Sequence, residues 1–463
     1  MISYWKNGAI KRDQCPTNTY TLLEFLRNTK RLTGTKEGCA SGDCGACTVV
    51  LVSLDVDEKL RYEAVNSCLM PAADLAGKAL ITVEDLADGD ALHPLQQAFI
   101  EQHASQCGFC TPGFILSALA LKKREPDPEI EAIDEALGGN LCRCTGYSPI
   151  VKAVQLADCS QDRFALLESE LIQSLKQLQM TTASVTGYYQ PSTLDELCGL
   201  KSQYPEAIVL AGGTDWMLRA TQGLEQVESL ISTERVDTLN ELSVVNGHWS
   251  VGAAVSLNRI KVQAKESGLD ALDHLLNRFA STQIRNRATL GGSIANASPI
   301  GDLAPLMLAL DAELTLSSSE LERFVPMSQF FLDYKQTQLR SDEVISRINF
   351  QVDDHAQVLF EKVTKRLDDD ISAVAVATHY FLDNGRISAL RIGLGGMAAT
   401  PILAKGAMSA FEGVEPSSIT LDQVKCALTE LSPLSDLRAS ADYRITVCAR
   451  VIHHHLSYIE AVQ

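Results

Sequence analysis

Eight of the thirteen cysteines fall into two sets whose spacing is typical of metal clusters. The first set is C-x4-C-x2-C with a later fourth cysteine, and the second is a C-x2-C pair with a later C-x-C pair. The two sets are Cys39, Cys44, Cys47 and Cys68, and then Cys107, Cys110, Cys142 and Cys144. Because four thiolates hold one [2Fe–2S] cluster, the eight cysteines predict two clusters. Two clusters indicate that electrons pass through this chain.

The first set has the spacing of plant-type [2Fe–2S] proteins. Gly38, Gly42 and Gly45 lie in the same segment, and glycine tolerates the left-handed backbone that a tight loop around a cluster requires. A structural zinc site is the alternative, but zinc is typically held by paired C-x2-C knuckles some distance apart. The spacing therefore favours an iron–sulfur cluster.

The second set is less specific, because similar pairs occur in zinc sites and a C-x2-C pair can be a redox dithiol. Both pairs are flanked by small residues between helical stretches, and a cluster in the first set needs somewhere to send its electrons. These two features favour a second cluster and leave the alternatives open. We interpret the other five cysteines as small buried hydrophobic residues: Cys15, Cys159, Cys198, Cys426 and Cys448.

The composition predicts a globular protein of about three domains, with 463 residues, 46% of them hydrophobic and 21% charged. The net charge of −18 argues against nucleic acid or anionic membrane as a partner, because both attract basic surfaces. No run of 18 apolar residues occurs, and the first fifteen residues lack the apolar core of a signal peptide. We therefore expect no membrane span and a cytoplasmic protein with reduced cysteines.

The first 160 residues divide into two predicted folding patterns. Residues 1–82 predict a small mixed sheet around one helix, with a helix over Thr21–Asn28 that starts in a Thr21/Glu24 capping box and a strand over Ala46–Leu54. Residues 83–160 predict four helices, most of them opening on a proline, with the cysteine pairs in the loops. These helices cover Leu92–Ala104, Pro112–Arg124, Pro128–Leu137 and Pro149–Ala157. A linker follows at 161–183, with an amphipathic helix over Phe164–Leu178.

From about residue 184 the cysteine sets end and glycine-rich loops begin. A buried strand over Ala207–Ala211 runs into Gly212–Asp215, and a second loop covers Thr289–Asp302. Such loops present many backbone N–H and hydroxyl donors, which suit a pyrophosphate. Tight turns are the alternative for either loop alone, but together they favour a bound flavin nucleotide. Gly393–Ala398 matches a dinucleotide fingerprint, yet Pro401 follows at once, so we interpret it as a turn.

Three segments, Gly34–Thr48, Gln106–Phe114 and Gly139–Tyr147, resemble the molybdenum hydroxylase family. The resemblance extends over essentially the whole chain, and it is closest to the small iron–sulfur and FAD subunits of two-subunit bacterial members that oxidise xanthine. It implies an α+β multidomain fold with four domains and a linker. These are a β-grasp ferredoxin-like domain (1–82), a four-helix [2Fe–2S] domain (83–160), the linker (161–183), a vanillyl-alcohol-oxidase-like FAD domain (184–350) and a C-terminal α/β flavoprotein domain (355–460).

The resemblance also implies which residues contact FAD and that the eight cysteines are the cluster ligands. The FAD contacts are Leu210, Gly212, Gly213, Thr214, Asp215, Phe279, Thr289, Leu290, Gly291, Gly292, Ser293, Asn296, Asp302, Ile345 and Lys362. Ser293 stands where several relatives have asparagine, so it keeps a donor and loses reach. The segment Lys365–Asp370 matches a loop near the flavin in relatives, which implies an influence on the electron acceptor.

The implied function is electron transfer within an oxidoreductase. A separate molybdenum-binding large subunit converts hypoxanthine or xanthine to urate, and the electrons pass through both clusters to FAD and then to NAD⁺. The implied assembly is a heterotetramer of two large and two small subunits, and this chain contributes no catalytic residue to the hydroxylation. The alternatives are the same electron path serving an aldehyde or N-heterocycle hydroxylase, a zinc-stabilised binding protein without redox role, and a cluster protein without FAD.

Overall fold

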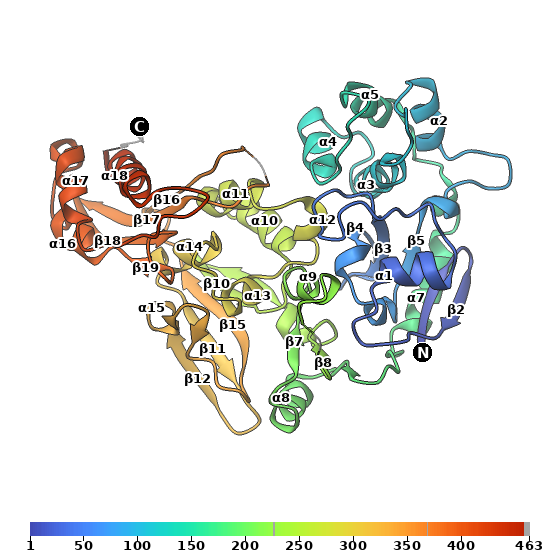
Figure 1. Ribbon diagram of the computed structural model, residues 1–463, viewed down its shortest axis with the longest axis horizontal. Coiled ribbons are helices and arrows are strands. Elements are labelled where there is room, and N and C mark those ends of the chain that lie inside the picture. Colours follow the sequence, from blue (N-terminus) through green and yellow to red (C-terminus); the bar gives the residue numbers. More distant parts are fainter. Residues whose placement is uncertain (226, 368, 458–463) are drawn as a thin grey trace. The chain divides into compact units, whose positions relative to one another are not determined.

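Figure 1 shows the computed structural model, which describes residues 1–225, 227–367 and 369–457. The chain packs as two units. Unit 1 combines residues 1–191, 206–235 and 281–288, and unit 2 combines 192–205, 236–280 and the chain from 289 onward. Three predicted features extend beyond the described residues: Gln226 of the FAD domain, Asp368 of the Lys365–Asp370 loop, and positions 458–460 of the C-terminal domain. Within the described ranges no helix combines the length and apolar character that crossing a membrane needs.

The N-terminal sheet of unit 1 is mixed and packs against one helix, as predicted (Figure 1). Its order is β2-β1-β5-β3-β4, with β1 and β5 parallel and the other neighbours antiparallel. The strands are β1 (Ile2–Lys6), β2 (Ala9–Asp13), β3 (Thr48–Leu54), β4 (Leu60–Asn66) and β5 (Ala79–Ile81). Successive side chains of β3 enter two different cores, Val49 and Leu51 on one face and Val50 and Val52 on the other. This is why the strand is apolar at every position from Val49 to Val52.

The predicted capping box forms at the start of the first helix, α1 (Leu22–Glu24). The hydroxyl of Thr21 accepts from the Glu24 N–H at 3.1 Å, and the Glu24 carboxylate accepts from the Thr21 N–H at 2.8 Å. The chain continues to Thr29 as a wider π-helical turn. Together these turns bury Leu22, Phe25 and Leu26 under the sheet, each worth roughly 1.5–3 kcal/mol.

Four helices follow the sheet and carry the second cysteine set in their loops, as predicted (Figure 1). They are α2 (Pro94–Glu101), α3 (Thr111–Arg124), α4 (Ile130–Leu137) and α5 (Ser148–Leu156). Prolines lie in the first turn of α2, α3 and α5, but the prediction for Pro128 is wrong, since α4 begins two residues later. Helix α3 is apolar on nearly all sides because it is enclosed by the other helices and by the β3 face of the sheet.

The connector after α5 forms two helices, α6 (Arg163–Leu166) and α7 (Glu168–Leu178), where the periodicity predicted one. The break lies at Leu167, which closes α6 and opens α7. The leucine stripe of α7, Leu171, Leu175 and Leu178, is buried in the same core as Trp5 of the sheet. The connector is therefore part of the packing of unit 1.

The remaining elements of unit 1 form a parallel three-stranded sheet, β6-β8-β7, and two short helices. They are β6 (Tyr188–Tyr189), β7 (Ile208–Leu210), α9 (Trp216–Thr221), β8 (Leu230–Ser232) and α12 (Thr282–Arg285). The strand predicted over Ala207–Ala211 is β7.

Unit 2 contains a five-stranded antiparallel sheet of order β12-β11-β15-β10-β9, with helices packed around it (Figure 1). The strands are β9 (Leu242–Val245), β10 (His248–Gly252), β11 (Glu313–Ser317), β12 (Glu322–Pro326) and β15 (Val344–Gln351), with a β13 (Phe331–Asp333) and β14 (Gln336–Thr337) hairpin beside them. The helices are α8 (Leu194–Gln203), α10 (Leu257–Glu266), α11 (Asp270–Asn277), α13 (Leu290–Ala295), α14 (Leu303–Ala309) and α15 (Met327–Phe330).

The C-terminal part of unit 2 is an antiparallel sheet, β16-β17-β18-β19, backed by three helices (Figure 1). These elements are β16 (Gln357–Val363), β17 (Val374–Asp383), β18 (Arg386–Gly395), β19 (Ile402–Leu403), α16 (Lys405–Phe411), α17 (Leu421–Ala427) and α18 (Ala441–Ser457). The Gly393–Ala398 segment was predicted as a turn, but Gly393–Gly395 belong to β18. A Cβ at Gly393 would lie 2.0 Å from the Pro305 carbonyl oxygen, so glycine serves close packing of this strand on α14.

A buried carboxylate links the four-helix region of unit 1 to the connector. Asp162 is fully buried and lies 2.5 Å from the Lys123 ammonium and 3.1 Å from His93 Nε2, and it accepts from the Ala165 N–H at 2.9 Å. Burial alone raises the pKa of Asp162, but the hydrogen bonds from His93 and Lys123 outweigh it and hold the pKa below its ordinary value. The ionised carboxylate is therefore part of the folded state.

We predict that Asp162→Asn destabilises the chain by about 3–5 kcal/mol at neutral pH, because it leaves the Lys123 ammonium largely buried without its carboxylate. The folded pKa lies below the ordinary value of about 3.9, so the advantage of the parent is complete above that pH and declines as the pH falls through the folded pKa. Urea unfolding at neutral pH and at about pH 3 measures both effects. Exposed Asp158→Asn is the control and should change little. An equal deficit at both pH values would contradict the prediction.

Candidate functional site

The first cysteine set lies on a loop that leads into β3 and on the turn after β4. Cys39 is exposed, Cys44 is half-buried, and Cys47 and Cys68 are buried. Ala40, Gly42 and Gly45 have positive φ, so the loop coils tightly around the thiols. Cys47 Sγ lies 3.4 Å from Cys68 Sγ, and a hydrogen bond between the thiols of Cys44 and Cys39 lowers the pKa of Cys39 to about 4. The four thiols thus meet as two pairs.

The second set repeats this arrangement at the ends of the helices. Cys110 is hydrogen-bonded to Cys142, and Cys107 to Cys144. Burial raises the pKa of Cys142, but hydrogen bonds from Thr145 and from the Cys144 N–H outweigh it and lower the pKa to about 7. Tyr147, in a left-handed conformation at the start of α5, accepts from the Cys142 N–H at 3.0 Å. The loop therefore presents its thiols with several donors directed at them.

The arrangement of both sets fits a [2Fe–2S] cluster, in which each of two irons takes two of the four thiolates. Each set offers two pairs at neighbouring positions. Over the described part of the chain, no group of three or more His, Cys, Asp or Glu side chains is arranged around a single metal position. The other cysteines are buried as predicted at Cys15, Cys159, Cys198 and Cys448, but the prediction for Cys426 is wrong, because this side chain is exposed.

The two cysteine loops touch each other backbone to backbone. The Leu141 N–H, next to Cys142, donates to the Cys44 carbonyl at 3.0 Å. A Cβ at Gly45 would lie 2.3 Å from the Gly139 carbonyl oxygen, and a Cβ at Gly113 would lie 2.3 Å from the Gly45 carbonyl oxygen. Only glycine permits this approach, so these residues fix how closely the two sets lie.

Five of the predicted FAD contacts lie in unit 1, where β7 ends and α9 begins: Leu210, Gly212, Gly213, Thr214 and Asp215. A Cβ at Gly212 would lie 1.7 Å from the Arg287 carbonyl oxygen, and Gly213 has φ +78°. Arg287 also donates from Nε to the Gly212 carbonyl at 3.2 Å and pairs with buried Asp74 at 2.5 Å. The charged side chain of Arg287 therefore fixes the backbone of this loop.

The same loop shares an apolar cluster with the first cysteine set. Met217 of α9 packs with Leu69, Cys47 and Cys68, and Trp216 packs at its edge. The Leu69 carbonyl oxygen would lie 3.3 Å from a Cβ at Gly213. One side of the Gly212–Asp215 turn thus packs directly on Leu69, the residue after Cys68 of the first cysteine set.

The other ten predicted FAD contacts lie in unit 2: Phe279, Thr289, Leu290, Gly291, Gly292, Ser293, Asn296, Asp302, Ile345 and Lys362. The segment Thr289–Asp302 was predicted as a loop, but Leu290–Ala295 form helix α13. Thr289 caps this helix by accepting from the Gly292 N–H at 3.0 Å, and Ser293 donates its N–H to the Thr289 carbonyl. A Cβ at Gly291 would lie 2.5 Å from the Ala253 Cβ, so this glycine permits close packing.

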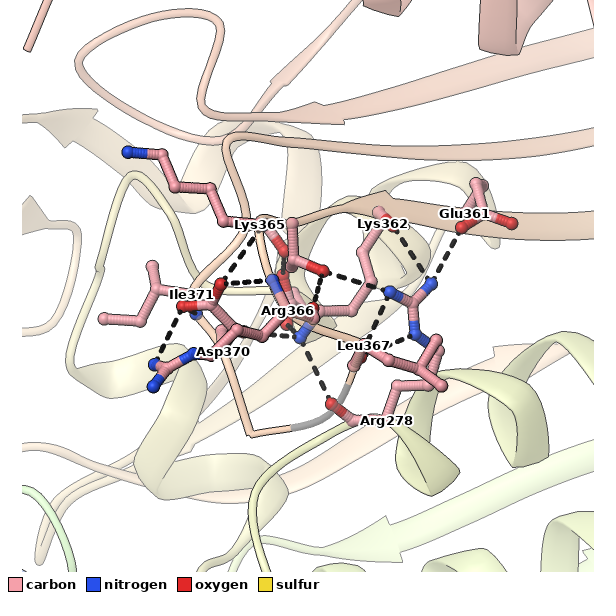
Figure 2. Close-up of polar contacts among 11 residues, drawn as sticks. Arg278, Glu361, Lys362, Lys365, Arg366, Leu367, Asp370 and Ile371 are labelled. Atoms are coloured by element: carbon pink, nitrogen blue, oxygen red, sulfur yellow. Dashed lines mark hydrogen bonds and ion pairs between the residues drawn. The ribbon is translucent and has the colours of Figure 1, made fainter. Parts of the chain in front are cut away.

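Lys362 and Asp302 are brought into direct contact, at 2.7 Å between Nζ and Oδ2, and both are buried. Figure 2 shows Lys362 pointing toward the Arg278 backbone and the Asp370 segment, where its ammonium donates to the Arg278 and Asp370 carbonyls at 3.3 and 3.0 Å. The Ser372 hydroxyl donates to the second Asp302 oxygen at 2.5 Å. The ion pair thus has its remaining hydrogen bonds filled, which a buried pair requires.

The Asp370 carboxylate closes the predicted Lys365–Asp370 loop (Figure 2). It accepts from the N–H groups of Lys365, Arg366 and Ile371 at 3.0–3.1 Å. Burial raises the pKa of Asp370, but hydrogen bonds from the Arg366 N–H, the Arg366 side chain and the Ile371 N–H outweigh it and hold the pKa below its usual range. Arg278 supports the other side of the loop by donating to the Leu367 carbonyl and to the Glu361 carboxylate. The Asp370 carboxylate therefore fixes the backbone of this loop.

We predict that Lys362→Met destabilises unit 2 by about 3–5 kcal/mol, because it leaves the buried Asp302 charge uncompensated. The double variant Lys362→Met/Asp302→Asn removes that charge and should recover a large part of the loss. Urea unfolding followed by circular dichroism measures both. If the single and double variants are equally destabilised, the deficit comes from lost packing and the prediction fails.

Four domain families match consecutive parts of the chain. A "2Fe-2S iron-sulfur cluster binding domain" matches residues 6–73, and a "[2Fe-2S] binding domain" matches 82–155. The "FAD binding domain in molybdopterin dehydrogenase" matches 180–350, and the "CO dehydrogenase flavoprotein C-terminal domain" matches 360–458. These matches confirm the predicted fold class and the presence of two [2Fe–2S] domains and an FAD-binding domain.

Individual relatives agree with the domain matches. Xanthine dehydrogenase 1 of Arabidopsis thaliana is 34% identical over 83% of this chain and 34% of its own length, so the chain spans about a third of this relative. Carbon monoxide dehydrogenase of Hydrogenophaga pseudoflava is 26% identical, with a TM-score of 0.54 over 58% of this chain and 94% of that one. Quinoline 2-oxidoreductase of Pseudomonas putida 86 is 28% identical, with a TM-score of 0.53 over 60% of this chain and 97% of that one.

Proposed function

This chain belongs to the molybdenum hydroxylase family, and we propose that it is the electron-transfer subunit of a xanthine dehydrogenase. The observation that carries the proposal is the pair of cysteine sets in one unit, whose loops are joined by the hydrogen bond from the Leu141 N–H to the Cys44 carbonyl. Two four-thiol sites joined in this way suit electron transfer between neighbouring redox centres, and the matches to two [2Fe-2S] domain families favour iron over zinc.

The proposed cluster ligands are the four thiols of each set. In the first, Cys39, Cys44, Cys47 and Cys68 hold one [2Fe–2S] cluster, and in the second, Cys107, Cys110, Cys142 and Cys144 hold the other. The donors directed at Cys142, from Thr145 and Cys144, stabilise a thiolate at this position. When bound, such clusters carry single electrons, and a flavin exchanges two as a hydride.

The proposed FAD contacts are the fifteen residues described above. Within unit 1, the Gly212–Asp215 turn packs against the Arg287 backbone, an approach that only a glycine at position 212 permits. Within unit 2, the first turn of α13 is fixed in place, because the Gly291 N–H donates to the Ala253 carbonyl at 3.1 Å and the Gly292 N–H to the Thr289 hydroxyl at 3.0 Å. Lys362 is fixed by Asp302 and two carbonyls, so its positive charge occupies one defined place.

The proposed partner is a large subunit that carries the molybdenum cofactor, in a heterotetramer of two large and two small subunits, with NAD⁺ as the final acceptor. The likeness to a chain of carbon monoxide dehydrogenase, an enzyme with a molybdenum cofactor, supports this partner, because the match covers 94% of that chain. Xanthine is the proposed substrate because the sequence relatives are xanthine dehydrogenases. The second candidate is an N-heterocycle hydroxylase, which the structural likeness to quinoline 2-oxidoreductase favours. The remaining parts of the proposal are the domain boundaries given above and a cytoplasmic location.

We predict that replacing one cysteine of either set lowers the iron content by about half, from about four to about two irons per chain, because each set holds one two-iron cluster. Cys44→Ser tests the first set and Cys142→Ser the second. Cys426→Ser, at an exposed cysteine outside both sets, is the matched control. Iron is measured on the purified chains, with absorbance across the visible range. Full iron in either cluster variant would contradict the assignment.

We predict that the chain copurifies with a molybdenum-containing subunit and that the complex reduces NAD⁺ with xanthine faster than with quinoline or an aldehyde. The separated chain should still be bleached by NADH under anaerobic conditions, because FAD and clusters belong to it. A faster reaction with quinoline would replace xanthine by an N-heterocycle as the proposed substrate and leave the proposed electron path unchanged. A chain that contains iron and flavin but does not react with NADH would remove NAD⁺ from the proposal.

A further inference from the structure

The short helix α12 lies in a segment, 281–288, that packs in unit 1 although the chain on both sides of it belongs to unit 2. We propose that this segment is a bracket that fixes the separation of the two cysteine sets, with Gln283 as its positioning residue. The proposal rests on the proposed function, because a fixed separation matters only if electrons pass between the sets. It gives this part of the FAD-binding family match a role other than contacting FAD.

The centre of the bracket is a buried polar network around Asn140. Gln283 is fully buried, and its Nε2 donates to Asn140 Oδ1 and to Ser117 Oγ, both at 2.9 Å. Ser117 Oγ in turn donates to Asn140 Oδ1 at 2.7 Å. These contacts orient the Asn140 amide so that its Nδ2 donates to the Gly45 carbonyl at 3.0 Å. Since Gly45 lies between Cys44 and Cys47, and Asn140 lies two residues before Cys142, the network joins the two cysteine loops.

The rest of the segment contacts both cluster regions. Toward the four-helix region, the Thr282 hydroxyl donates to the Glu135 carbonyl at 3.1 Å, and Arg285 pairs with the Glu135 carboxylate at 2.5 Å. Toward the sheet, Asn286 Nδ2 donates to the Ala64 carbonyl on β4 at 2.9 Å, four residues before Cys68. Ile284 packs against the apolar cluster that includes Cys47 and Cys68. A single turn of helix is thus fastened to the region of each cysteine set.

Close packing leaves this bracket little freedom. A Cβ at Gly139 would lie 2.2 Å from Gln283 Oε1 and 2.4 Å from the Ser281 Cβ. Gln283 is therefore in close contact with the backbone that precedes Cys142. A buried network in which each member orients the next is sensitive to the loss of one donor, since the others then lack a fixed partner. Removing the Gln283 amide should loosen the hydrogen bond from the Leu141 N–H to the Cys44 carbonyl.

The test uses the full chain with its cofactors, purified without oxygen, and compares three variants. Gln283→Leu removes the amide and keeps the size. Asn18→Leu is the matched control, because it removes another buried side-chain amide of unit 1, which donates to the Gly187, Val227 and Glu228 carbonyls rather than to either cysteine loop. Ser117→Ala is a smaller change in the network and serves if Gln283→Leu does not fold. The first readout is the electron paramagnetic resonance spectrum of the fully reduced protein, in which two nearby clusters split each other's signals.

The expected result is that the splitting changes in Gln283→Leu, changes less in Ser117→Ala, and is unchanged in Asn18→Leu, while all four chains contain equal iron. The second readout is hydrogen exchange at the Leu141 N–H, which should be about tenfold faster in Gln283→Leu, as expected for a local opening that has lost its supporting hydrogen bonds. Asn18→Leu should leave this rate unchanged.

The inference is overturned if Gln283→Leu, or Ser117→Ala where the former does not fold, keeps the parent splitting and the parent exchange rate at Leu141. It is also overturned if Asn18→Leu produces the same changes, because loss of any buried amide of unit 1 would then have the effect assigned to Gln283. A parent chain without iron would overturn the proposed function itself, and the bracket with it.

Discussion

The structure of unit 1 depends on the backbone contact between its two cysteine loops. The Leu141 N–H reaches the Cys44 carbonyl only because Gly45 and Gly113 have no side chain at the points of closest approach. A Cβ at either position would lie 2.3 Å from a facing carbonyl oxygen, so a larger residue would force the loops apart. The sheet with α1 on one side and the four helices on the other both serve to bring these loops together.

The glycine-rich turn Gly212–Asp215 packs on the same part of unit 1, next to the first cysteine set. The Arg287 side chain donates to the Gly212 carbonyl of this turn and forms an ion pair with the fully buried Asp74 carboxylate. Met217, one turn further, packs on Cys47, Cys68 and Leu69. Unit 2 contains a comparable arrangement of charges. Lys362 and Asp302 form a buried ion pair, and Ser372 and two backbone carbonyls complete the hydrogen bonds of this pair. In both units, charged side chains fix backbone whose shape the proposed cofactors need.

The features that the sequence predicted are those that depend on neighbours along the chain. The cysteine spacing, the Thr21/Glu24 capping box and the four helices each depend on a short run of residues. The errors have local causes too, such as the break at Leu167 and the cap at Thr289, which forms a helix where glycines indicated a loop. The assignment of the eight cysteines and fifteen FAD contacts stays a prediction, although the structure brings Asp302 and Lys362 together.

Sequence reasoning missed the residues that act across long separations. Gln283 meets Asn140 over 143 positions, and Arg287 meets Asp74 over 213. No motif links such pairs, and a buried glutamine or arginine in a polar run is not distinguishable from a surface one by type. The glycines Gly393 and Gly395 show the same limit, because their role is packing against Pro305, far earlier in the chain.

The most direct test of this account is a metal and flavin analysis of the chain purified without oxygen, together with its visible spectrum. The account predicts about four irons and one FAD per chain, little zinc, and the broad absorbance of [2Fe–2S] clusters. Zinc in place of iron, without flavin, would contradict it. The eight cysteines would then be structural sites, and the contact between their loops would serve stability alone.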